Sequence, residues 1–178
     1  MVAPTASRLA VQRVAWDDPR AVALRDAMED EMNALYGPMA DALPAGVMEQ
    51  LSVGFDVLPG TIVATVLALD GDIPVGQAGL RPHGPDASGD IALEVKKVVV
   101  DPQHRGRGVS RLLMTAVEDV ARGLGIRRLI LQTGPLQPVA IALYEKVGYV
   151  PIEPYPPYEL MPGALCYDKI LGEDTNPD

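Results

Sequence analysis

A strand–helix–strand pattern in the second half of the chain constrains the fold more than any other feature. Residues 91–100 (IALEVKKVVV) are rich in β-branched side chains and stop at Asp101-Pro102, which predicts a strand. Residues 109–124 carry apolar side chains at three- and four-residue steps, which is typical of an amphipathic helix. Residues 126–133 (IRRLILQT) predict a second strand. Two strands separated by one helix pair in parallel within a sheet, so we expect an α/β fold with a right-handed crossover here.

The other predicted strands add antiparallel neighbours to this unit. Residues 61–80 predict two strands joined by Asp70-Gly71, because this dipeptide is a strong hairpin signal. Further strands are predicted at residues 8–15, 149–152 and 164–171, the first of them as an edge strand. The expected sheet is therefore mixed, and its exposed terminal strands make a homodimer conceivable.

Two more helices are predicted from caps and prolines. One begins at Pro19 and ends at Gly37-Pro38, because proline suits a first helical turn and glycine follows many last turns. We expect one stripe of this helix to face inward: Leu24, Met28, Glu31, Met32 and Leu35. The other helix covers residues 138–148. Residues 38–60 and 81–90 are rich in proline and glycine and predict loops, the first with a short helix.

Composition limits the classes of function. The 178 residues are 48% apolar and 22% charged, which predicts one globular domain over residues 1–171 and a disordered tail at 172–178. No run is long enough to span a membrane, and the single cysteine excludes an intrachain disulfide and suggests the cytoplasm. The net charge of −9 argues against a nucleic-acid partner, and the two histidines lack zinc-site spacing, so no metal is expected.

The segment QHRGRGVS, residues 103–110, predicts an anion site. The first amides of a helix have no intrahelical partner, and glycines let a ligand approach the backbone. Arg105, Arg107 and the hydroxyl of Ser110 add donors suited to phosphate oxygens. The motif lacks the lysine of a P-loop and the third glycine of a dinucleotide-binding fingerprint. The alternative is an ordinary glycine turn with solvated arginines.

Two segments resemble the GNAT acyltransferase superfamily. QHRGRG matches its Q/R-x-x-G-x-G/A signature, and AIALYEKVGY, residues 140–149, is similar to its second characteristic segment. The resemblance covers residues 73–150 well. It implies a mixed, mostly antiparallel sheet with splayed central parallel strands flanked by helices. It also implies that the loop amides bind the pyrophosphate of acetyl-coenzyme A.

Site residues follow from this resemblance. The implied cofactor-binding residues are Val98, Val99, Val100, Gln103, His104, Arg105, Gly106, Arg107, Gly108, Val109, Ser110, Gln137 and Tyr144. The valines would act through backbone groups, and the Val99 amide would hold the thioester oxygen. Gln137 is a departure, since many relatives have asparagine there.

Tyr144 and Glu94 are the implied catalytic residues. Tyr144 would protonate the departing thiolate, because phenol and thiol pKa values are close; alternatively it is a half-buried helix tyrosine. Glu94 would be the general base, its pKa raised by burial, or it would pair with Lys96 two residues along the strand.

The acceptor site is predicted mainly by position. Tyr155 and Tyr158 lie between prolines and predict an aromatic wall, with Glu153 or Glu159 near an amine, or alternatively an exposed surface loop. Tyr36, Met39 and Met48 are further substrate candidates. The expected function is acetyl transfer from acetyl-coenzyme A to a small-molecule primary amine by direct attack, without a covalent intermediate on Cys166. The alternatives are a protein or peptide N-acetyltransferase and a non-catalytic acyl-coenzyme A-binding module.

Overall fold

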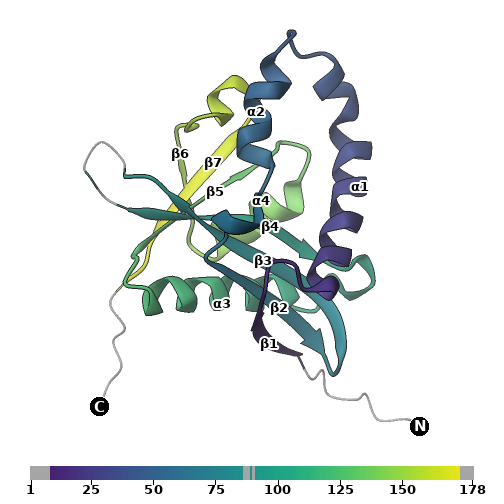
Figure 1. The fold of residues 1–178 in the computed structure, drawn as a ribbon, viewed down its shortest axis with the longest axis vertical. Coiled ribbons are helices and arrows are strands. Elements are labelled where there is room, and N and C mark those ends of the chain that lie inside the picture. Colours follow the sequence, from purple (N-terminus) through teal and green to yellow (C-terminus); the bar gives the residue numbers. More distant parts are fainter. Residues whose placement is uncertain (1–8, 86–88, 90, 173–178) are drawn as a thin grey trace.

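A mixed seven-stranded sheet forms the centre of the computed structural model, which describes residues 9–85, 89 and 91–172 (Figure 1). The strands are β1 (Leu9–Val14), β2 (Ala64–Asp70), β3 (Ile73–His83), β4 (Ala92–Val100), β5 (Arg128–Thr133), β6 (Val150–Ile152) and β7 (Leu165–Ile170). The helices are α1 (Pro19–Asp41), α2 (Val47–Phe55), α3 (Val109–Gly123) and α4 (Pro138–Lys146), with 3-10 turns at η1 (Pro59–Thr61), η2 (Pro102–His104) and η3 (Tyr158–Leu160). The expected α/β class and the strand–helix–strand unit are confirmed.

The two central strands are parallel and splayed. The sheet order is β1-β2-β3-β4-β5-β7-β6, and every neighbouring pair except β4 and β5 is antiparallel. The β4–β5 pairing covers Ala92–Glu94 against Arg128–Ile130, while β4 continues to Val100 and β5 to Thr133. The carboxyl halves of these strands are therefore free of each other, as the resemblance implied.

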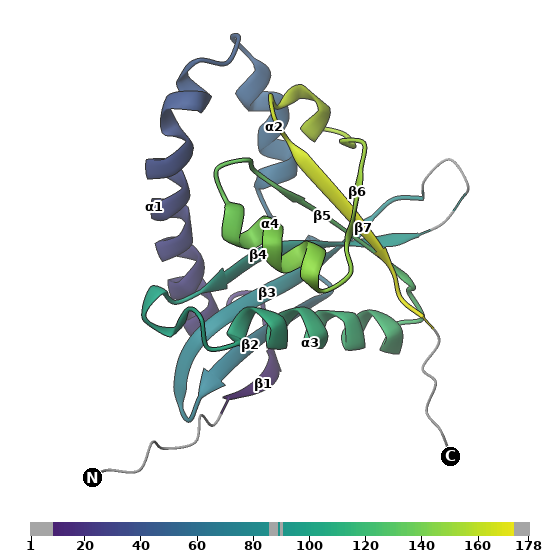
Figure 2. The same cartoon turned by 180° about the vertical axis from the view of Figure 1, so that it is seen from behind.

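Helices cover both faces of the sheet (Figures 1 and 2). On β2, Val66 and Ala68 belong to the main core with Leu113 and Val117 of α3. Leu67, which points to the opposite face because strand side chains alternate, packs with Ala21 and Leu24 of α1. The crossover helix and the first helix thus lie on opposite sides of the sheet.

Helix α1 is longer and less buried than predicted. It continues through Gly37 and Pro38 to Asp41, because a proline's fixed φ is compatible with a helix and only one backbone bond is lost near its end. The buried residues of α1 are Ala21, Leu24 and Arg25, whereas Glu31 and Leu35 are exposed and Met28 and Met32 are half-buried. The amino-terminal half packs on the sheet, and the other half extends beyond it (Figure 1).

Strand β3 is also longer than predicted, since Arg81, Pro82 and His83 continue it rather than begin a loop. Their partners on β4 are Glu94, Leu93 and Ala92, so tertiary pairing overrides the loop-like composition. The expected tail lies outside the described residues apart from Gly172. In the part of the chain that is described, none of the helices has the length and apolar character needed to cross a bilayer.

Candidate active site

The glycine loop between β4 and α3 leads into a helix start whose first backbone amides have no intrahelical acceptor. Gly108 is the N-cap of α3, and the first helical bond runs from the Leu112 amide to the Gly108 carbonyl at 3.0 Å. The four amides from Gly108 to Arg111 therefore have no intrahelical acceptor. Gly106 and Gly108 have φ angles of +76° and +85°, and no atom lies within 4 Å of a Cβ built on either glycine. This open, amide-lined helix start has the chemistry of an anion site.

The loop arginines are already paired with carboxylates. Arg105 lies 2.6 Å from Glu31 of α1, and Arg107 lies 2.6 Å from Asp70 at the β2–β3 turn. Such exposed pairs contribute little stability and exchange readily with other anions. They fasten the loop to α1 and to the hairpin.

The start of the loop is fixed by Asp101. Its Oδ1 accepts from the Gln103 amide at 2.8 Å and lies 3.0 Å from His104 Nδ1. The hydrogen bond with His104 lowers the pKa of Asp101, burial opposes this effect, and the hydrogen bond from the Gln103 amide adds to the lowering. Gln103 and His104 thus shape the loop through their contacts with Asp101.

Strand β4 contains an irregularity immediately before Val98. The register with β3 shifts between Gln77 and Gly79, and Lys97 has a φ of +52°, a left-handed conformation that costs a non-glycine residue about 1–2 kcal/mol. This bulge lies at the start of Val98–Val100, the backbone segment predicted to bind the cofactor.

Tyr144 projects from α4 into an aromatic cluster. Its ring centroid lies 6.1 Å from that of Tyr149 and 6.3 Å from that of Tyr167, and the residue is buried. Burial raises its pKa to about 12, so the phenol is fully protonated at neutral pH. The gap between the pKa of Tyr144 and that of a thiol is therefore wider than the ordinary phenol pKa suggested, and proton transfer from Tyr144 to a thiolate is less favourable.

Tyr36 and Gln137 meet although 101 residues separate them. The Tyr36 hydroxyl accepts from the Leu136 amide at 3.1 Å and from Gln137 Nε2 at 3.4 Å. A Cβ on Gly134 would lie 2.1 Å from the same hydroxyl oxygen. Tyr36 therefore closes α1 onto the turn between β5 and α4.

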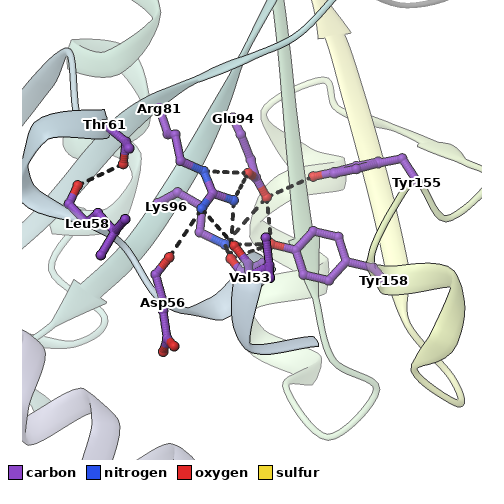
Figure 3. A network of polar contacts seen from close by, with 10 residues as sticks. Val53, Asp56, Leu58, Thr61, Arg81, Glu94, Lys96, Tyr155 and Tyr158 are labelled. Atoms are coloured by element: carbon purple, nitrogen blue, oxygen red, sulfur yellow. Dashed lines mark hydrogen bonds and ion pairs between the residues drawn. The ribbon is translucent and has the colours of Figure 1, made fainter. Parts of the chain in front are cut away.

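Glu94 lies at the centre of a buried polar network (Figure 3). It is 1% exposed. Its Oε1 accepts from Tyr158 at 2.8 Å, from Tyr155 at 3.2 Å and from Lys96 at 3.4 Å, and its Oε2 accepts from Arg81 Nε at 3.2 Å. The structure thus brings together three predicted residues, Glu94, Tyr155 and Tyr158, and the ion pair with Lys96 is buried rather than superficial.

Arg81 and Lys96 join this network to the carboxyl end of α2. Besides Glu94, Arg81 donates to the carbonyls of Val53, Gly54 and Asp56, and Lys96 donates to the Gly54 carbonyl at 2.8 Å and to the Tyr158 hydroxyl at 2.7 Å. Helix carboxyl ends attract cations, so the placement is favourable. All five N–H groups of Arg81 and all three of Lys96 are satisfied by protein groups.

The charges in this network reverse one expectation. Burial raises the pKa of Glu94, but Lys96 and Arg81 outweigh burial and hold that pKa below its ordinary value. The prediction that burial would tune Glu94 upward is therefore wrong. Burial lowers the pKa of Lys96 to about 8, against the attraction of Glu94. Burial and the Glu94 charge raise the pKa values of both Tyr155 and Tyr158.

A cavity of about 330 Å³ has Glu94 among its lining residues. Its lining residues are Val53, Gly54, Asp56, Leu58, Thr61, Arg81, Pro82, His83, Glu94, Pro156 and Pro157. The His83 ring contacts Tyr155 edge-on at 5.0 Å. Burial lowers the pKa of His83, which favours its neutral form.

Several acceptor candidates do not line this cavity, including Tyr155 and Tyr158, which were predicted to form its aromatic wall. Tyr36 contacts the α4 turn, Met48 is exposed, and Glu153 and Glu159 are exposed and outside the cavity lining. Sequence reasoning missed Arg81, His83 and the carboxyl end of α2. Extending the predicted hairpin by three residues would have placed Arg81 opposite Glu94.

Comparison with known proteins places this site in a family context. The family model described as "Acetyltransferase (GNAT) family" matches residues 24–149. An IAA acetyltransferase of Azospirillum brasilense is 41% identical over 78 residues, which are 44% of this chain and 51% of that protein. N-acetyltransferase 8 of Rattus norvegicus is 36% identical over 75 residues, 42% of this chain and 34% of that protein. The chain thus spans about half or less of the length of these relatives.

Solved structures share the whole fold. A Klebsiella pneumoniae protein assigned as an acyl-CoA N-acyltransferase superposes with a TM-score of 0.69 at 26% identity, over 93% of this chain and 99% of that one. The Escherichia coli GNAT family N-acetyltransferase YhbS, solved in complex with CoA, gives a TM-score of 0.61 at 17% identity, over 98% of this chain and 87% of that one. The second likeness concerns the fold alone.

Proposed function

The chain belongs to the GNAT acetyltransferase family, and from this premise we propose that it transfers the acetyl group of acetyl-coenzyme A to a primary amine of a small molecule. The observation that carries the proposal is the row of amides from Gly108 to Arg111, which have no intrahelical acceptor and lie where β4 and β5 have separated. Neighbouring folds solved with CoA or acetyl-CoA support the choice of co-substrate.

The loop and β4 would hold the co-substrate. Amides from Gly108 to Arg111 face the pyrophosphate, and Arg105 and Arg107 exchange Glu31 and Asp70 for phosphate oxygens. The amides of Gln103, His104 and Arg105 are already bonded within the turn that starts at Asp101.

The backbone of Val98–Val100 follows the pantetheine arm. A preorganised amide of this segment, aimed at the thioester oxygen, lowers a barrier of this kind by about 3 kcal/mol. The expected Val99 amide is not suited to this role, because Val99 pairs with Gln77 of β3 two residues from the Asp101–Val75 hydrogen bond, so its amide faces β3; the Val98 amide faces the other way.

Transfer then needs one bond made and one broken. The nitrogen of the neutral amine attacks the thioester carbon, the carbon–sulfur bond breaks, and the thiolate takes a proton from the Tyr144 hydroxyl. The former amine nitrogen gives its surplus proton to solvent, and the Tyr144 phenolate regains a proton from solvent. The raised pKa keeps that hydroxyl protonated until the thiolate forms. Cys166 is buried and burial raises its pKa, which agrees with direct attack rather than a thioester on the enzyme.

Glu94 belongs in this proposal chiefly as part of the acceptor site. A carboxylate whose pKa is held low by two cations accepts a proton weakly at neutral pH, and this argues against the general-base role. Glu94 lines the cavity, but its two oxygens already accept from two tyrosines and two cations. Its contribution to acceptor binding is therefore to hold these neighbouring groups in place.

A small acceptor fits the cavity better than a protein chain. Its volume of about 330 Å³ is at the lower end for small-molecule sites, and Pro156 and Pro157 wall one side. An IAA acetyltransferase among the relatives is consistent with a small molecule. The single buried cysteine suits the cytoplasm, and the open edges of β1 and β6 offer surfaces for a homodimer.

An amine panel with acetyl-coenzyme A, followed by release of free thiol, tests the proposal. We expect at least one small primary amine to release thiol above the amine-free rate, and peptides to be poorer acceptors. Binding of coenzyme A without thiol release from any amine would instead identify a non-catalytic module. Faster turnover of peptides than of every small amine would assign a protein acceptor.

A further inference from the structure

The bulge in β4 is held from the neighbouring strand by Gln77. This glutamine is 0% exposed. Its Nε2 donates to the carbonyl oxygen of Lys97, the residue with positive φ. A left-handed non-glycine residue persists where its surroundings fix it, and Gln77 supplies such a fixing contact at the carbonyl itself.

Arg25 anchors Gln77 from the first helix. Its Nη1 donates to Gln77 Oε1 at 3.2 Å, and its Nη2 donates to the Trp16 carbonyl at 2.6 Å. The guanidinium carbon lies 3.6 Å from the centroid of the Trp16 ring. A relay of buried polar groups thus leads from α1 through Gln77 to the bulge.

Neighbouring contacts leave the bulge little freedom. A Cβ on Gly76 would lie 2.7 Å from the Val99 carbonyl oxygen, and one on Gly79 would lie 2.9 Å from the Trp16 ring. Lys97 Nζ also pairs with Glu29 of α1 at 3.0 Å. The backbone immediately after Lys97 is therefore set by β3 and α1 together.

We propose that Gln77, anchored by Arg25, is a positioning residue for acyl transfer: it holds the Lys97 carbonyl and thereby aims the Val98 amide, which belongs to the same peptide bond, at the thioester. The inference rests on the proposed function, because it assumes that this backbone receives the acyl group. Gln77 contacts no reacting atom in this scheme. A displacement of about 1 Å at such a site costs about a hundredfold in rate, which is the scale of effect expected.

The test compares Gln77→Leu and Gln77→Glu with wild type. Leucine removes the donor at similar volume, whereas glutamate keeps an oxygen for Arg25 but has no donor for the Lys97 carbonyl. Both variants should lose about tenfold or more in kcat, while the KM for acetyl-coenzyme A and the Kd for coenzyme A change by less than about threefold. We expect kcat to fall while KM and Kd stay nearly constant, because neither substitution changes the loop that would bind the pyrophosphate.

Thr65→Val is the matched control. Thr65 is a buried polar residue of β2 opposite Gly79, and its hydroxyl has no partner among the described residues. This variant should retain wild-type kcat and KM. Folding of each variant is verified by its unfolding temperature, and kinetics are measured well below that temperature.

The possible results distinguish a failure of the Gln77 role from a failure of the proposed acetyltransferase function. Wild-type kcat in folded Gln77→Glu would overturn the positioning role, as would equal losses of kcat and coenzyme A affinity, which indicate general disruption. If wild type binds coenzyme A but acetylates no amine, the proposed function itself fails and the kinetic comparison has no basis.

Discussion

Tyr144 and Tyr149 lie in one aromatic cluster, and their hydroxyl groups allow matched single-atom deletions. The Tyr149 hydroxyl is buried and has no hydrogen-bond partner within the described part of the chain. Tyr144→Phe should lower kcat by about a hundredfold, the usual effect of losing a general acid, with little change in coenzyme A affinity. Tyr149→Phe should keep wild-type kcat and gain up to about 1 kcal/mol of stability, since an unsatisfied buried group is removed. Steady-state kinetics and urea unfolding measure both. Equal kcat values in the two variants would remove Tyr144 from the acid role.

Gly106 offers a second test at the residue scale. Gly106→Val should weaken coenzyme A binding by about a hundredfold, about 2.7 kcal/mol, because the side chain fills the open approach to the loop and the φ of +76° disfavours it. Gly60→Ala is the control, since no atom lies within 4 Å of its Cβ and its φ is not positive. Calorimetry gives the affinities. Normal affinity in folded Gly106→Val would show that the loop is misassigned.

At the scale of elements, α2 is fastened to the segment after β6 through Gly54. A Cβ there would lie 2.8 Å from both Pro157 and Tyr158. Gly54→Ala should therefore destabilise the protein by about 1–3 kcal/mol, whereas Gly37→Ala in α1, with open space around it, should stabilise it by about 0.5–1 kcal/mol. Urea unfolding distinguishes the signs. Stabilisation by both substitutions would mean that α2 is not docked in solution.

The elements that sequence predicted correctly are those with a local signal. The β4–α3–β5 unit, the Asp70-Gly71 hairpin and the Gly148 end of α4 each follow from a period or a turn residue. The continuation of β3 to His83 does not, because it depends on Arg81 meeting Glu94. The end of α1 was predicted too early. Pro38 lies close to the end of this helix, where a proline costs only one backbone hydrogen bond, and the helix continues to Asp41.

The residues of the candidate site also differ in whether a local sequence signal marks them. The glycine loop and Tyr144 lie in contiguous motifs, so the sequence alone could nominate them as site residues. The cavity lined by Glu94 joins α2, β3, β4 and the Pro156-Pro157 segment, and no local pattern links these segments. Glu94 was found, but the direction of its pKa shift required knowing that two cations share its surroundings.

At the scale of the whole molecule, the Glu94 network makes stability depend on pH in two windows. The folded pKa of Glu94 is lowered, so its stabilisation is present above the unfolded pKa and is lost as pH falls through the folded value. The folded pKa of Lys96 is lowered from 10.5 to about 8, so its penalty disappears as pH rises across that interval. Stability should therefore rise between about pH 8 and 10 and fall in acid.

Two variants distinguish the acid effect, assigned to Glu94, from the alkaline effect, assigned to Lys96. Glu94→Gln should lose about 3–5 kcal/mol at neutral pH, because it leaves two buried cations uncompensated, and should differ less from wild type below about pH 4. Lys96→Met should stay within about 1 kcal/mol of wild type at pH 7 and lose the alkaline rise. Urea unfolding from acid to alkaline pH gives these curves. An alkaline rise that survives in Lys96→Met would assign it to another group.

Because Tyr36 and Gly134 are in contact, the substitutions that each of these two distant positions tolerates depend on the residue at the other. Any side chain at 134 would overlap the tyrosine hydroxyl, so the glycine becomes replaceable once the aromatic residue has been lost. Saturation libraries should show this as sign epistasis: alanine at 134 is harmful with Tyr36 and tolerated with a small residue at 36.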